Sequence, residues 1–137
     1  MKAEGIELAD NTVLSVKLHR FDRAQPIKSW YALLISIGND EKHLINFNIG
    51  SADSLMITEM RPKWKIMTGQ RKFKLPADFQ IAKRNGSLIF IINGKVAYTT
   101  DDDPNHPFTE LSIRTSSPNQ ADAVAIQIDP PTICKLK

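Results

Sequence analysis

Apolar and polar residues alternate along most of this chain with a period of two residues, and no stretch shows the period of a helix. Leu14, Val16 and Leu18, for example, are separated by Ser15 and Lys17. This alternation is typical of a β-strand with one face against the core, because successive side chains point to opposite faces. The same pattern, or a short apolar run, recurs at residues 30–37, 44–48, 55–57, 73–81, 88–92, 111–113 and 124–128. The pattern therefore predicts an all-β protein of about ten short strands.

Turn residues separate these runs at short intervals. Asn93-Gly94 directly follows the run at residues 88–92 and is the strongest local signal for a β-hairpin. Asn85-Gly86 marks a second tight turn. Gly38-Asn39-Asp40 is expected to end the strand at residues 30–37. Pro130-Pro131 disfavours any extension of the last strand. Short strands joined by regular turns indicate either a sandwich or a closed barrel.

The composition is that of an ordinary globular protein without covalent cross-links. The 137 residues are 42% apolar and 24% charged, and Cys134 is the single cysteine, so no disulfide can form within the chain. The first residues hold no apolar segment of the secretory kind, and the longest apolar run, Trp30–Ile35, is far shorter than the roughly 20 residues that cross a bilayer. We expect one domain over residues 1–137, located in the cytoplasm and not inserted in a membrane.

The sequence offers no set of residues that would make an enzyme. It lacks a nucleophile elbow, a phosphate-binding loop, a dinucleotide fingerprint and a zinc-protease motif. His19, His43 and His106 are far apart, and one cysteine adds too few soft ligands for zinc. The acidic run Asp101-Asp102-Asp103 lacks the spacing of a calcium loop and is interpreted as a solvated turn. We therefore expect no catalytic activity, no cofactor and no metal.

Two groups of polar residues remain as candidates for binding. Asn46 and Asn48 flank Phe47, so both should project from the same face of one strand. Amide side chains suit sugar hydroxyl groups because each amide both donates and accepts hydrogen bonds. The alternative is an ordinary solvent-facing strand.

The second group is a basic segment, which we define as residues 61–76. It holds six basic side chains, no acidic one, and Trp64. An indole ring can stack on a sugar ring or on a nucleobase. The alternative is a basic loop that Trp64 anchors to the core.

The order of these segments resembles a galectin carbohydrate-recognition domain, from about residue 14 to residue 128. The apolar strand ending in Gly38 and the following Leu44-Ile45-Asn46-Phe47-Asn48 are similar to the family's region around L-x-H-F-N-P-R. Leu55–Glu59 is similar to the next strand, Trp64 to the stacking tryptophan, and Gly69-Gln70-Arg71 to the E-x-R motif. The resemblance implies a two-sheet antiparallel β-sandwich of the jelly-roll kind, metal-independent and without enzymatic activity.

The resemblance also implies a sugar site, with several positions changed. Asn46 stands at the family's His position, Gly50 at its Arg position and Glu59 at its later Asn position. Asn48 is kept, and Gly69 replaces the Glu of E-x-R. The carbohydrate-binding residues implied for this chain are Asn46, Asn48, Glu59, Trp64 and Arg71.

The main interpretation is a lectin that binds β-galactosides or related glycans, including acidic or sulfated ones, on a concave sheet face. The first alternative is a galectin-related protein that has lost lactose binding and acts through protein contacts or a homodimer, because the altered contacts each cost affinity. A third interpretation, binding of RNA or another polyanion by residues 61–74, ranks well below both, so nucleic acid is not the expected partner. The resemblance also implies export without a signal peptide.

Overall fold

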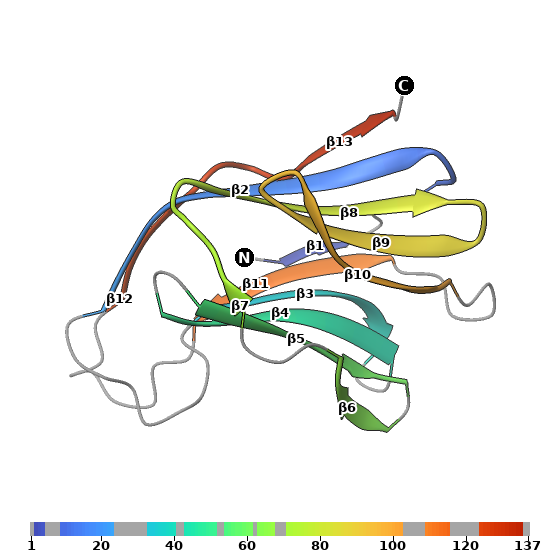
Figure 1. Cartoon of the computed structure of the whole chain (residues 1–137), viewed down its shortest axis with the longest axis horizontal. Coiled ribbons are helices and arrows are strands. Elements are labelled where there is room, and N and C mark those ends of the chain that lie inside the picture. Colours follow the sequence, from blue (N-terminus) through green and yellow to red (C-terminus); the bar gives the residue numbers. More distant parts are fainter. Residues whose placement is uncertain are drawn as a thin grey trace.

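The computed structural model of the chain consists of two antiparallel sheets packed face to face (Figure 1). It describes residues 2–4, 9–23, 33–40, 43–51, 54–61, 63–67, 71–102, 109–115 and 124–135. Its first sheet runs in the order β1-β11-β3-β4-β5-β6, with β7 also paired to β5, and its second in the order β10-β9-β8-β2-β12, with β13 also paired to β2. The predicted two-sheet β-sandwich is thereby confirmed.

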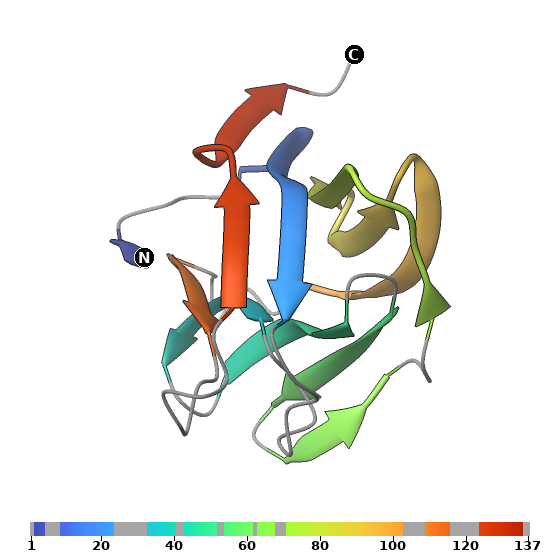
Figure 2. The same cartoon turned by 90° about the vertical axis from the view of Figure 1, so that its left-hand side faces the viewer.

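Most strands are short, as the alternating pattern predicts, and β2 is the longest described strand at 12 residues. The first sheet contains β1 (Lys2–Glu4), β3 (Leu33–Asp40), β4 (His43–Ser51), β5 (Ser54–Met60), β6 (Trp64–Ile66), β7 (Arg71–Lys72) and β11 (Glu110–Thr115). The second contains β2 (Thr12–Arg23), β8 (Ala77–Arg84), β9 (Ser87–Ile92), β10 (Lys95–Asp101), β12 (Val124–Ile128) and β13 (Thr132–Lys135). Figure 2 shows β2 and β12 lying side by side in one layer, across from β3, β4 and β5.

The core lies between the sheets and is built from the inward side of each alternation. Phe47 of β4 meets Phe79 of β8 and Phe90 of β9, with ring centroids 5.4 and 5.6 Å apart. All three rings are almost fully buried. Because aromatic residues bury large apolar areas, these contacts between sheets are a main source of stability.

Two predicted hairpin turns have the expected backbone. Asn93 and Gly94 have φ angles of 49° and 81°, and Asn85 and Gly86 have 52° and 77°. Two successive positive φ angles make the turn whose twist matches that of the flanking strands, and Asn-Gly tolerates that conformation. The β9–β10 hairpin follows at Asn93-Gly94, as predicted.

Some predicted boundaries are wrong. The expected turn at Gly38-Asn39-Asp40 is part of β3, which continues through a bulge and pairs Asp40 with His43. The run at residues 73–81 is not one strand, because β7 ends at Lys72 and β8 begins at Ala77. β12 ends at Ile128, before Pro130-Pro131, as expected, but the chain then forms an additional strand, β13, which the sequence did not predict and which pairs with β2. The predicted strand residues 30–32 lie outside the described residues.

Within the described chain, no helix is long and apolar enough to span a membrane.

Candidate functional site

The outer face of the first sheet carries a group of buried polar side chains. Ile45, Phe47 and Ile49 of β4 point into the core, so Asn46 and Asn48 point away from it, as the sequence predicts. The cross-strand partners of Asn46 are Ser36 on β3 and Thr58 on β5. Directly paired residues of an antiparallel sheet project to the same side. These four residues, which we call the amide cluster, are Ser36, Asn46, Asn48 and Thr58.

Hydrogen bonds connect the four members of the amide cluster. The Ser36 hydroxyl donates to Asn46 Oδ1, and Asn46 Nδ2 donates to Thr58 Oγ1 over 3.3 Å. Asn48 Nδ2 donates to the same Thr58 oxygen over 2.8 Å and to the Met56 carbonyl over 3.3 Å. No described residue donates to Asn48 Oδ1. That oxygen is the part of the cluster left to accept a hydrogen bond from a ligand.

The amide cluster is shielded from solvent. Asn46 and Asn48 are each 7% exposed and Thr58 is 1% exposed. Buried polar groups of this kind are retained only when hydrogen-bonded, because an unpaired amide loses its bonds to water without replacement. The alternative of an ordinary solvent-facing strand is therefore wrong.

Trp64 lies at the edge of the same face. β6 pairs with β5 so that Trp64 stands opposite Met60 and Ile66 opposite Thr58. The register therefore directs Trp64 and Ile66 to the side of the sheet that carries the amide cluster. Their exposed fractions are 48% and 46%, and neither belongs to the core. The alternative that Trp64 anchors a loop in the core is therefore wrong.

Glu59 is directed to the other side of the sheet. Its cross-strand partner in β4 is Ile45, which belongs to the core, and its neighbour Ile57 two residues earlier is fully buried. The Glu59 Oε2 atom is buried and has no hydrogen-bond partner among the described residues. The residue that β5 places beside the two asparagines is Thr58. The pairing register between β4 and β5 distinguishes Thr58 from Glu59.

The structure divides the basic segment between two ends of the first sheet. Lys63 and Lys65 are exposed around β6, and Arg61 donates through Nη1 to the Asp101 carbonyl over 2.8 Å. Lys72 lies in β7, at the other end of β5. Arg71 pairs through its backbone with Leu55, and its side chain lies outside the described residues, as do Gly69 and Gln70. The described basic residues are therefore divided between the two ends of β5.

No cluster of three or more His, Cys, Asp or Glu side chains suited to a metal ion occurs within the part of the chain that the structure describes.

Comparison with known proteins identifies the architecture. No protein-family model matches the sequence, and neither does any curated protein sequence. Among solved structures, a variant of human galectin-16 superposes with a TM-score of 0.66 at 11% identity, covering 98% of this chain and 94% of that chain. CG-16, a homodimeric agglutinin from chicken liver, gives 0.59 at 9% identity, with 98% of each chain covered.

Toad ovary galectin, solved as a complex with N-acetylgalactose, gives a TM-score of 0.56 at 10% identity and covers 97% of this chain and 96% of its own. The chain therefore has a galectin-like fold, as the order of its motifs indicates. At these identities the likeness shows the fold alone.

Proposed function

We propose that the protein is a non-enzymatic glycan-binding module whose sugar site is the outer face of the first sheet, between the amide cluster and Trp64. The observation that carries this proposal is the half-exposed indole of Trp64 on the same face as a buried, hydrogen-bonded polar cluster. An indole packs against the apolar face of a sugar ring, while nearby polar groups bind the hydroxyls. Buried amides are also held in one geometry before the ligand arrives, which lowers the entropic cost of binding.

Each residue has a separate role in this proposal. Trp64 stacks on the ring, and Asn48 Oδ1 accepts a hydrogen bond from a sugar hydroxyl. Asn46 and Thr58 orient Asn48 through the network described above. Arg71 remains a proposed polar contact at the far end of β5. Glu59 is left out, because β5 directs it toward the core side of the sheet.

The ligand class follows from the fold and from the substitutions. The toad ovary relative was solved with N-acetylgalactose, which makes a galactoside the first ligand to test. Gly50 offers no side chain where the family has an arginine, and a sugar hydroxyl left without its partner costs about 1–3 kcal/mol. We therefore expect weak lactose binding or a preference for a different glycan, including an acidic or sulfated one.

A glycan array with lactose competition, repeated at high salt, tests the proposal. Trp64→Ala should remove binding while the thermal unfolding temperature stays close to that of the wild type. The matched control is Ile133→Ala, which removes an equally exposed apolar side chain (45%) from β13 in the other sheet. Full glycan binding by Trp64→Ala would overturn the proposal. Binding that is seen at low salt and lost at high salt would favour a polyanion ligand instead.

A second function is favoured by a specific observation. The amide nitrogens of Asn46 and Asn48 already donate to Thr58 and to neighbouring backbone carbonyls, which leaves few donors for a sugar. Trp64 and Ile66 then form an exposed apolar strip on the short strand β6, a surface suited to protein contact or a homodimer. The chicken liver agglutinin, which is homodimeric, shares the fold. Two results together would support this function. The protein should bind no glycan on the array, and light scattering after size exclusion should show a dimer that Ile66→Asp dissociates.

A further inference from the structure

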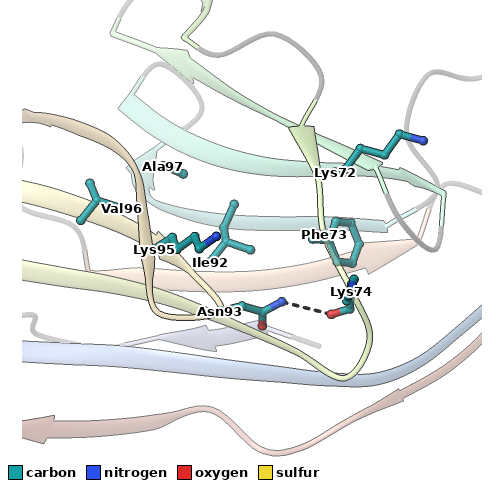
Figure 3. A pocket seen from close by; sticks show the side chains of 8 residues that line it. All are labelled: Lys72, Phe73, Lys74, Ile92, Asn93, Lys95, Val96 and Ala97. Atoms are coloured by element: carbon teal, nitrogen blue, oxygen red, sulfur yellow. Dashed lines mark hydrogen bonds between the residues drawn. The ribbon is translucent and has the colours of Figure 1, made fainter.

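A pocket opens between the segment that follows β7 and the β9–β10 hairpin. Its volume is about 500 Å³, within the range of small-molecule sites. Figure 3 shows the side chains that line it, which come from two segments distant in the sequence. They are Lys72, Phe73, Lys74, Ile92, Asn93, Lys95, Val96 and Ala97.

The pocket combines an apolar floor with a basic rim. Phe73 is buried against Phe79, with ring centroids 5.5 Å apart, and Ile92 is partly buried beside it. Val96 is 60% exposed, so its apolar surface is accessible to a ligand. Lys95 reaches toward Phe73 across Ile92 in Figure 3.

The charge of this pocket has one sign. Three of its eight lining residues are lysines, at positions 72, 74 and 95, and none is acidic. Neither Lys74 nor Lys95 forms an ion pair with a described residue. Lys74 and Lys95 therefore give this pocket a positive potential, which favours an anion.

Asn93 holds the two walls of the pocket together. Its Oδ1 atom accepts a hydrogen bond from the Asp78 backbone over 2.8 Å, and its Nδ2 atom donates to the Lys74 carbonyl over 3.1 Å. The Asn93 backbone N–H also donates to the Asp78 carbonyl over 2.9 Å. One of these bonds joins the turn directly to the Lys72–Lys74 segment, and the other two hold the turn on Asp78 of β8. Both walls of the pocket are therefore fixed before any ligand binds, which favours affinity.

We propose that this pocket binds a small amphipathic anion, meaning a carboxylate, sulfate or sulfonate joined to an apolar ring or chain. The apolar part contacts Phe73, Ile92 and Val96, and the anionic group lies between Lys74 and Lys95. This site is separate from Trp64 and the amide cluster, and the one proposed glycan contact beside it in the sequence is Arg71, the neighbour of Lys72 on β7. β7 pairs with β5 at Ser54 and Leu55, whereas β6, which carries Trp64, pairs with it at Thr58–Met60, so the two strands lie at opposite ends of β5 (Figure 1).

The probe for this site is the fluorescent sulfonate 8-anilinonaphthalene-1-sulfonate, titrated into the folded protein, with uncharged N-phenyl-1-naphthylamine as the neutral analogue. We expect one saturable sulfonate site, weaker binding at high salt, and clearly weaker binding of the neutral dye. The double variant Lys74→Gln/Lys95→Gln should lower sulfonate affinity by about tenfold or more, because hydrogen bonds to charged groups are the strong ones.

The matched control is Lys63→Gln/Lys65→Gln, which removes the same charge from exposed positions near β6. This control and Trp64→Ala should leave the sulfonate affinity unchanged, and circular dichroism verifies that every variant is folded. The proposal would be overturned if the two dyes bound equally well or if no saturable site were found. It would also be overturned if both double variants lost sulfonate affinity to the same extent, or if Trp64→Ala lost it. None of these outcomes depends on whether a glycan binds.

Discussion

Replacing Thr58 by valine tests the amide cluster directly. Valine keeps the branched shape of threonine but exchanges its hydroxyl for a methyl group, so the main change is the loss of one acceptor. Thr58 is 1% exposed, so water cannot replace that acceptor. The side chain accepts from Asn46 Nδ2 at 3.3 Å and from Asn48 Nδ2 at 2.8 Å.

The two asparagines should contribute unequally to the loss. Asn46 Nδ2 has no other acceptor among the described residues, so it loses its bond and stays desolvated, at about 1–3 kcal/mol. Asn48 Nδ2 keeps the Met56 carbonyl at 3.3 Å and should contribute about 1 kcal/mol. The free energy of unfolding of Thr58→Val should therefore fall by about 2–4 kcal/mol. For a chain of this length, the midpoint temperature should fall by roughly 8–16 °C.

Urea unfolding followed by circular dichroism measures the change, with an unchanged m-value as evidence that the folded state stays compact. Thr99→Val, at an exposed position of β10, is the matched control and should stay within about 0.5 kcal/mol of the wild type. A double-mutant cycle between Thr58→Val and Asn48→Ala should give a coupling energy of about 1 kcal/mol. A Thr58→Val protein as stable as the wild type would refute the hydrogen-bond assignment of the cluster.

Four other predictions concern the core, the turns and the free thiol. Phe47→Ala should lower the free energy of unfolding by about 3–5 kcal/mol, because it empties the contact between the sheets; a loss below about 1 kcal/mol in urea unfolding would contradict that packing. Gly38→Ala should cost about 1–3 kcal/mol, since an added Cβ would lie 2.7 Å from the His43 carbonyl oxygen. Asn93→Ala should be less stable by about 1–3 kcal/mol, because it loses two side-chain hydrogen bonds and the residue's tolerance of positive φ; thermal unfolding beside Asn93→Gly, which keeps the φ, separates the two causes. Cys134 is exposed, so a thiol reagent should modify it in the folded protein without denaturant, and protection of that thiol would indicate that its strand is covered.

Local patterns in the sequence were sufficient to predict most of the strands and two of the turns. The alternation at Leu14, Val16 and Leu18 predicts their burial, and all three belong to the core. Asn93-Gly94 predicts its hairpin because few other residue pairs tolerate two positive φ angles. These features depend on neighbouring residues alone, and for that reason one sequence reveals them.

Local patterns in the sequence predict only part of the candidate site. That Asn46 and Asn48 share a face follows from the two-residue period of one strand. Thr58 and Ser36 were missed, and Glu59 was assigned to the wrong face, because their positions depend on how β5 and β3 are aligned with β4. A shift of one residue in that alignment exchanges the two faces. The alternation within β5 is weak, because Met56 and Met60 on one face are apolar like Leu55 and Ile57 on the other.

The sequence by itself therefore determined that this is an all-β protein, where most strands lie, which side chains of strongly alternating stretches such as Leu14–Leu18 face the core, and which family's motif order it resembles. Only the tertiary structure decided that the two asparagines are buried in a shared network, that Trp64 is exposed beside them, and that the basic segment is divided between two ends of a sheet. It alone brought Lys72–Lys74 next to the hairpin around Asn93 to form a pocket. The physical reason is that strand identity is set by short-range sterics and hydrophobic period, whereas register and the packing of distant segments depend on contacts between residues far apart in the chain.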